Sequence, residues 1–369
     1  MNWETIEQKA KYSIDLTEEE VKWLFEFQNP SDLKRLYALA NQVNERLNGR
    51  AVSFIHNMNV NYTNICEYHC TFCEFKKSPI SKDAYILSFE DVKQRLNASD
   101  GALSEITFQG GLSSKVKFQE VLDLLKQIRE AYPQIHFHAF SPEEIDYYAS
   151  QTGLSYFDIV TQAKEAGMNS MCGTAAEILD DEVRKKICWE KISSDEWCEI
   201  IKTAHGMGLP STATILFGHV ETSHHVANHF KRIRDLQRET GMITEFIPLL
   251  FMPDKTKLGR VVDKSIDRIQ YAFKMIAVAR LYFMNDIRNI QTSWVKLGWE
   301  NAIRSLSYGA NDMSGTLYHE NITREAGGEH GEYTPREKFI VEISKIGKTP
   351  VERDTLYSYQ KNTIAAAKT

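Results

Sequence analysis

Three cysteines lie within eight residues of the sequence, in the segment CEYHCTFCEF. Their spacing is Cys66-x3-Cys70-x2-Cys73, and the aromatic residue Phe72 stands directly before the last cysteine. Three thiolates on one short loop can bind three irons of a [4Fe-4S] cluster and leave the fourth iron open. An open iron can chelate the amino and carboxylate groups of S-adenosylmethionine (SAM), and one electron then cleaves the sulfonium to release a 5′-deoxyadenosyl radical. The spacing therefore predicts Cys66, Cys70 and Cys73 as cluster ligands, with Phe72 in the cofactor site.

Two simpler interpretations of the cysteines stay open. They could be buried by chance, or they could belong to a zinc site, which normally needs four ligands and could take His69 as the fourth. Clustered cysteines in a reducing compartment favour metal over disulfides. The remaining cysteines, Cys172, Cys188 and Cys198, are dispersed and are predicted to be small buried hydrophobes.

Composition limits the class of protein. The chain has 369 residues, of which 42% are hydrophobic and 25% charged, enough for a substantial core in one large domain or two ordinary ones. The net charge is −6 and no Lys/Arg-rich tract occurs, which argues against a nucleic-acid partner. No basic, apolar leader and no run of about 18 apolar residues is present, so we expect a cytoplasmic protein without a membrane partner.

Strand-like and helical segments alternate after residue 50. The helical segments place apolar residues on one face, as in KFQEVLDLLKQIREAY. Eight strand-then-helix units in series predict an α/β fold of the (β/α)8 TIM-barrel type. The expected strands are a first strand after residue 50, then 105–111, 134–142, 168–173, 211–221, 243–251, 287–297 and 305–313. We expect an N-terminal helical cap over 1–49, the barrel over 50–330, and a short extension with a helix and tail over 331–369.

Strand ends carry the other candidate site residues, because the carboxyl ends of barrel strands hold the active site. Gly110 and Gly111 end the second strand, where missing side chains would let the backbone approach the amino group of SAM. Taken singly, the polar residues at the other strand ends are more often surface or capping residues, but their shared position favours a site. They are Ser141, Glu144, Glu177, Arg184, His219, Glu221, Glu245, Trp294, Lys296, Asn311 and Asp312.

Several segments resemble those of a radical SAM family. This family includes the deazaflavin (FO) synthase subunits and two menaquinone-pathway enzymes, aminofutalosine synthase and dehypoxanthine futalosine cyclase. The segments, which extend over nearly the whole chain, are NYTNICEYHCTFCEF, ITFQGG, GTAAEIL, TATILFGHVET and LQRETG. The resemblance implies a radical SAM barrel with a [4Fe-4S] cluster and SAM as cofactors.

Within that family, other segments are most similar to the FO synthase subunit that transfers the 4-hydroxyphenyl part of tyrosine to 5-amino-6-(D-ribitylamino)uracil. These are HAFSPEEI, GTAAEILDDEVRKKIC, GHVETSHHVANHF, TEFIPL, SWVKLG and GANDMSGTLYHENITREAG, whereas the menaquinone enzymes tend to have KAFTAVEI-like or GGGAEI-like segments. The chain departs from the family where Cys172 replaces a proline, Met242 and Ile243 replace Gly-Phe, and Ser314 replaces a glycine. These departures could reshape the substrate pocket.

The resemblance also implies residue roles. Glu177 and Arg184 would hold SAM, with Arg184 pairing the methionine carboxylate, and Ser141 would lie in the same cofactor site. His219, Glu221, Glu245, Asn311 and Asp312 would orient the tyrosine and the ribityl-uracil or move protons.

Partners follow from the same resemblance. The chain has one C-x3-C-x2-C motif, so a separate second radical SAM subunit would complete FO, and a reductant such as ferredoxin or flavodoxin would supply electrons. A menaquinone-pathway enzyme and a non-catalytic iron–sulfur protein remain the alternatives.

Overall fold

Parallel strands form the centre of this computed structural model, which describes residues 1–358. Six strands form one sheet in the order β2-β3-β4-β5-β6-β7, and three form another in the order β8-β1-β9. The strands are β1 (Ala51–Ile55), β2 (Asn57–Asn61), β3 (Glu105–Gln109), β4 (His136–Ala139), β5 (Ser170–Met171), β6 (Ser211–Phe217), β7 (Ile243–Leu250), β8 (Asp312–Gly315) and β9 (Thr349–Arg353). The fold is the TIM-type α/β barrel that the sequence predicts.

Single-residue bridges join the two sheets on the side where a seventh barrel strand was expected. Ile290 bridges to Phe246 of β7 and Gln291 bridges to Asp312 of β8. The prediction of a strand over 287–297 is wrong beyond these two residues, because helix α12 (Trp294–Leu297) starts at once. The buried Trp294 indole donates to the Gly315 carbonyl at 3.0 Å, which draws the chain out of the sheet over the end of β8. The eighth strand also starts later than predicted, at Asp312.

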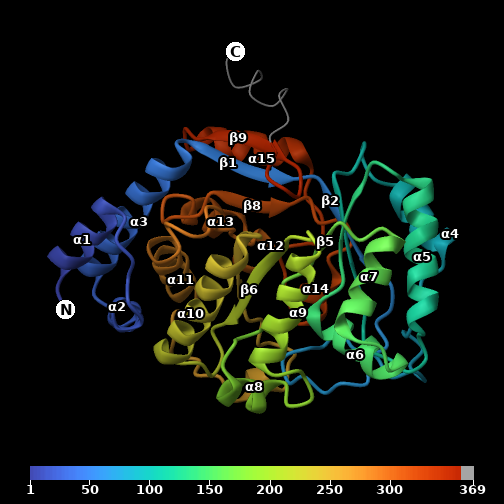
Figure 1. Cartoon of the computed structure of the whole chain (residues 1–369). Coiled ribbons are helices and arrows are strands. Elements are labelled where there is room, and N and C mark those ends of the chain that lie inside the picture. Colours follow the sequence, from blue (N-terminus) through green and yellow to red (C-terminus); the bar gives the residue numbers. More distant parts are fainter. Residues whose placement is uncertain (359–369) are drawn as a thin grey trace.

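Helices surround the sheets, and Figure 1 shows α4 to α7 on one side of the barrel and α10, α11 and the N-terminal helices on the other. Helix α5 buries Phe118, Val121, Leu122, Leu125 and Ile128 against the sheet, as its periodicity predicts. The remaining helices are α1 (Trp3–Tyr12), α2 (Glu18–Phe25), α3 (Pro30–Asn48), α4 (Phe89–Asn97), α5 (Phe118–Ala131), α6 (Pro142–Thr152), α7 (Tyr156–Ala166), α8 (Asp181–Ile187), α9 (Ser194–Gly206), α10 (Ser223–Thr240), α11 (Arg268–Tyr282), α13 (Trp299–Ser305), α14 (Asn321–Glu325) and α15 (Arg336–Lys345). No helix in the described part of the chain has the length and apolar character needed to cross a bilayer.

The predicted first strand is divided at His56 into β1 and β2. Strand β2 pairs with β3, whereas β1 pairs with β8 on one side and β9 on the other. The sequence gives no sign of β9, which follows α15 where only a tail was expected; the last part of that expected tail, 359–369, lies outside the described residues. Figure 1 shows β1, β8 and β9 grouped at the end of the barrel opposite α6 and α8. Strand β9 therefore completes the end of the barrel where the strands begin.

Candidate active site

The cysteine loop follows β2 and borders a cavity at the carboxyl ends of the strands. Cys66, Cys70 and Cys73 are free thiols, half-buried, and all three line the cavity. The Thr71 amide donates to the Ile187 carbonyl at 2.8 Å, which fixes the middle of the loop to the end of α8. The sequence therefore brings the three thiols together at the mouth of one cavity.

The donor set fits an iron–sulfur cluster, since thiolates are its protein ligands. Burial raises the pKa of the Cys70 and Cys73 thiols, while the positive charge of Lys191 acts in the opposite direction. His69, the candidate fourth zinc ligand, directs Nδ1 to Glu190 at 3.1 Å. Among residues 1–358, no group of three or more His, Cys, Asp or Glu side chains is placed so that it could hold one metal ion. Three cluster cysteines bind three different irons and do not need a common centre.

Gly110 and Gly111 lie where β3 meets the cysteine loop. A Cβ on Gly110 would be 2.3 Å from the Tyr62 ring, and a Cβ on Gly111 would be 2.3 Å from the Ile65 carbonyl oxygen. The Gly110 amide donates to the Glu144 carboxylate at 3.0 Å. Both glycines line the cavity, and both are needed for the loop to pack closely against β3.

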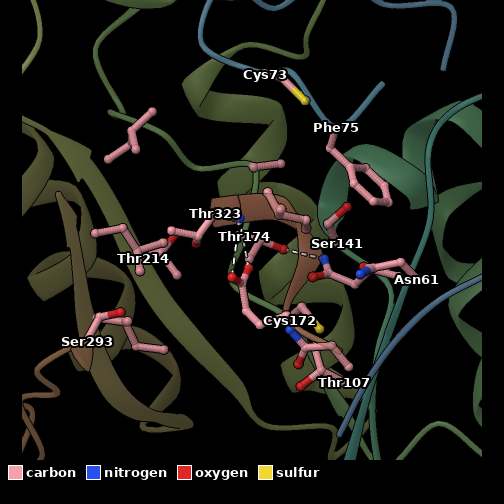
Figure 2. Close-up of a pocket in the computed structure, with 18 of the residues that line it drawn as sticks. Asn61, Cys73, Phe75, Thr107, Ser141, Cys172, Thr174, Thr214, Ser293 and Thr323 are labelled. Atoms are coloured by element: carbon pink, nitrogen blue, oxygen red, sulfur yellow. Dashed lines mark hydrogen bonds between the residues drawn. The ribbon is translucent and has the colours of Figure 1, made fainter. Parts of the chain in front are cut away.

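The cavity has a volume of about 410 Å³ and extends from the cysteine loop into the barrel. Figure 2 shows Cys73 and Phe75 at one end and Thr107, Cys172 and Ser293 toward the other. Among the predicted site residues, the structure places eleven in the cavity wall: Cys66, Cys70, Cys73, Phe72, Gly110, Gly111, Ser141, Glu144, Glu177, Glu245 and Lys296.

Lys191 is a half-buried cation in this wall, beside the cysteine loop. Its Nζ lies 2.7 Å from Glu177 Oε1, and both side chains are about one-eighth exposed, at 12% and 13%. The same ammonium lies over the Phe72 ring, 5.5 Å from its centroid. Glu143, on the first turn of α6, also lines the cavity, and burial raises its pKa to about 7 while Lys191 opposes that shift. Lys191 thus pairs directly with Glu177 and acts on Glu143 through its charge.

Arg184 lies behind the wall rather than in it. Its Nε and Nη2 donate to the Ile192 carbonyl at 3.0 and 2.6 Å, and its Nη1 donates to the Ala176 carbonyl at 2.6 Å. These bonds fix the chain on either side of α8, including the segments that carry Glu177 and Lys191. In this structure Arg184 acts on the site through the backbone, and its predicted contact with SAM stays a prediction.

Backbone strain gathers around the same cavity. Phe140, Ala175, Glu177, Ser314 and Leu317 have φ values of 56°, 64°, 46°, 64° and 55°. Each value lies in the left-handed region that non-glycine residues rarely adopt, and such strain clusters at functional sites. Four of these residues line the cavity, and Phe140 directly precedes Ser141. The surrounding fold therefore holds these residues in backbone conformations that are unfavourable for the isolated chain segments.

Glu245 lies at the deep end of the cavity in a polar network. Its Oε2 accepts hydrogen bonds from the Tyr357 hydroxyl at 2.7 Å and the Gln291 amide at 2.9 Å. The Arg353 Nη2 lies 3.5 and 3.4 Å from its two oxygens, and the Arg353 Nε donates to Asp312 at 2.6 Å. Burial raises the pKa of Glu245 to about 7, although the positive charge of Arg353 acts to lower it. Asp312 therefore orients Arg353 from beneath the cavity.

Three further candidates lie outside the cavity wall and have structural partners. Glu221 accepts from the amides of Gly218 and His219, so it satisfies the turn after β6, and His219 Nε2 lies 3.0 Å from the Leu216 carbonyl. Asn311 accepts from the Arg280 guanidinium at 2.7 Å. The structure does not bring these residues together with Glu245, and their proposed roles toward the substrates stay predictions.

Two of the departures from the family pattern face the cavity. Cys172 and Ser314 both line it, and the Cys172 thiol lies 3.2 Å from the His138 carbonyl oxygen. Ile243 is buried at the start of β7, away from the cavity wall. Cys172 and Ser314 are therefore the departures that can affect substrate fit.

Other cavity residues were missed by the sequence analysis. Alternation of polar and apolar residues within β2 and β3 was the available signal, because polar residues at inward positions are unusual in a packed barrel. Lys191 carried no such signal because it lies in the irregular connection between α8 and α9, and Arg353 carried none because it ends β9, a strand that was not predicted. The missed residues are Asn57, Asn59, Asn61, Glu105, Thr107, His138, Lys191, Gln291 and Arg353.

Comparisons with known proteins match most of the chain. The model of the radical SAM superfamily matches residues 60–233, and that of the CofH/MqnC C-terminal region matches 239–366. The 5-amino-6-(D-ribitylamino)uracil–L-tyrosine 4-hydroxyphenyl transferase of Methanopyrus kandleri is 40% identical over 89% of this chain and 90% of its own length. That of Archaeoglobus fulgidus is 41% identical over 87% of this chain and 92% of its own. The crystal structure of methylornithine synthase is 18% identical, with a TM-score of 0.72 over 98% of this chain and 99% of its own, and shares the fold.

Proposed function

Because the chain belongs to the radical SAM superfamily, and within it to the family of 5-amino-6-(D-ribitylamino)uracil–L-tyrosine 4-hydroxyphenyl transferases, we propose that it transfers the 4-hydroxybenzyl part of L-tyrosine to this uracil. In this reaction the Cα–Cβ bond of tyrosine breaks, the rest of tyrosine leaves as an imine, and the benzyl carbon forms a C–C bond to C5 of the ring. The reaction belongs to the biosynthesis of the deazaflavin FO. The observation that carries the proposal is the identity of about 40% with such transferases over nearly the whole of both chains.

The described residues fit the cofactors of this superfamily, a [4Fe-4S] cluster and SAM. Cys66, Cys70 and Cys73 would hold the cluster. Glu177 and Lys191, which lie beside the loop, would hold SAM, because the Lys191 ammonium is a suitable partner for a carboxylate. When bound, these cofactors would supply a 5′-deoxyadenosyl radical by reductive cleavage of SAM, which could abstract a hydrogen atom from the amino group of tyrosine.

The chain itself contributes enclosure and proton control. The cavity lies inside the barrel, so the reacting atoms are shielded from solvent that would quench a radical. Glu245 is a buried carboxyl whose pKa burial raises to about 7, so it can hold or release a proton near neutral pH at the deep end of the cavity.

Two partners complete the proposal. The chain has one C-x3-C-x2-C motif, so a separate radical SAM polypeptide would close the deazaflavin ring. A low-potential reductant such as ferredoxin or flavodoxin would supply the electron.

The test is anaerobic incubation of the reconstituted protein with SAM, dithionite, tyrosine and the ribityl-uracil, followed by mass spectrometry. We expect 5′-deoxyadenosine and the coupled product together. If 5′-deoxyadenosine forms without the coupled product, the radical chemistry stands and the substrate assignment fails; menaquinone-pathway intermediates are then the next substrates to supply.

A further inference from the structure

The cavity wall changes character along β7. The side chains of β7 that line the cavity are, in order toward the cysteine loop, Glu245, Ile247 and Leu249. At about 3.3 Å per strand residue, Glu245 lies roughly 13 Å from Leu249 along the strand, on the deeper side. Strand β6 shows the same order, with Thr212 deep and Leu216 nearer the loop. This side of the cavity is polar at its deep end and apolar near the cysteines.

The opposite wall is polar along its whole length. Asn57, Asn59 and Asn61 of β2 line it, as do Thr107 and Gln109 of β3. The Asn61 side chain is 4% exposed and its Nδ2 has no hydrogen-bond partner among the described residues. A buried donor left unpaired is costly, which favours a polar ligand beside it. One wall therefore suits polar groups throughout, and the other separates an apolar section from a polar floor.

At that floor, one carboxylate oxygen is available to a ligand. Tyr357 and Gln291 both donate to Oε2 of Glu245, whereas Oε1 has only the 3.5 Å contact with Arg353 among the described residues. Gln291 uses its amide N–H on Glu245, so its own carbonyl oxygen is a second acceptor. Arg353 contributes a fixed cation, held by Asp312 at 2.6 Å.

We propose that Glu245, Gln291 and Arg353 form the binding site of the ribityl-uracil. Tyrosine then binds nearer the cysteine loop, against Leu216, Ile247 and Leu249. The inference rests on the proposed function and assigns each substrate to one section of the cavity. A diaminouracil has several ring N–H and C=O groups and a polyhydroxylated chain, all of which need polar partners when buried. The 4-hydroxyphenyl ring is largely apolar, and the amino group of tyrosine must lie close to SAM, at the cysteine end.

The decisive variant is Glu245→Gln, because its effect has a defined direction. Donation from Tyr357 and Gln291 holds the amide oxygen at the Oε2 position, so the variant presents an NH2 donor where the wild type presents an acceptor. We expect the Kd for the ribityl-uracil, measured by anaerobic calorimetry, to rise roughly 10-fold or more while the Kd for tyrosine changes less than about 2-fold. Leu249→Ala is the matched variant in the apolar section, and we expect it to weaken tyrosine binding and leave ribityl-uracil binding unchanged.

The outcomes separate this inference from the function on which it rests. If wild-type protein forms the coupled product but Glu245→Gln binds the ribityl-uracil normally, or weakens tyrosine binding instead, the ribityl-uracil site is wrongly assigned and the proposed function stands. If the protein binds the ribityl-uracil in a Glu245-dependent way but the wild type forms no coupled product, the proposed function is wrong and the assigned ribityl-uracil site stands. Gln291→Leu, which removes the second acceptor, provides an independent check, and circular dichroism verifies that each variant is folded.

Discussion

The Arg353 guanidinium donates to the Asp312 carboxylate at 2.6 Å, and both side chains are at most 2% exposed. This ion pair ties β9 to β8 beneath the cavity, with Ser53 of β1 donating to the same carboxylate oxygen at 2.7 Å.

Removal of one partner of that pair should strongly destabilise the fold. We expect Arg353→Met to lower the free energy of unfolding by about 3–5 kcal/mol, because it leaves the buried Asp312 without its cation. Urea denaturation of the purified protein measures this effect. Lys345→Met is the control, since Lys345 pairs with Glu342 at the surface and an exposed pair contributes less than about 1 kcal/mol. Equal losses in the two variants would contradict the role of Arg353.

Cys70→Ala should prevent cluster assembly without unfolding the barrel, since the half-buried loop adds little to the core. We expect loss of the cluster absorbance and electron paramagnetic resonance signals and no 5′-deoxyadenosine above background. Cys198→Ala, on α9 away from the cavity, should retain iron and activity. A Cys70→Ala protein that still cleaved SAM at the wild-type rate would refute the assignment of the cluster.

Lys191→Met should weaken SAM binding by roughly 10-fold or more, because it removes the cation that the cavity wall offers to the methionine carboxylate. Equilibrium dialysis with labelled SAM on the reconstituted protein measures the Kd. Lys191→Arg should restore part of the affinity. If Lys191→Met binds SAM normally while Arg184→Lys does not, Arg184 reaches the cofactor in the bound state and the assignment moves to it.

Glu143 should make stability depend on pH in a defined direction. Burial raises its pKa to about 7 in the folded protein, above the ordinary value of 4.5, so the folded state binds this proton more tightly than the unfolded state. The resulting stabilisation is present below pH 4.5 and is lost as the pH rises through about 7. Glu143→Gln removes this term, so we expect the variant to gain up to about 3 kcal/mol relative to wild type between pH 4.5 and 8. Parallel urea titrations over that range test it, and a constant difference would show that the Glu143 pKa is not raised.

Local pattern accounts for most of what the sequence predicted. The cysteine spacing and the strand ending in Gly110 and Gly111 are short-range signals, and the structure places all of them at the cavity mouth. The segment 287–297 was misread because its apolar residues suit a strand and a buried helical turn equally, and the contact of Trp294 with Gly315 decides between them.

Partners distant in the chain account for what was missed. Arg353 belongs to the site only because β9 pairs with β1, which no local pattern reveals. A polar residue at a strand end can either satisfy the backbone amides of the following turn or face the cavity, and the sequence does not distinguish these two roles. Glu221 satisfies turn amides, whereas Glu245 faces the cavity.

The pairing of β9 with β1 also affects the order in which the protein folds and unfolds. Ala51 aligns with Thr349, so this ladder closes a very long loop of chain, and contacts of such high sequence separation form late in folding. We therefore expect the floor of the cavity to be assembled last and to open first in partial unfolding, since few elements besides β1, β8 and α15 hold it. Under conditions that cause only partial unfolding, the enzyme would then lose affinity for the ribityl-uracil, while the cysteine loop, fixed to β3 and α8, remained in place.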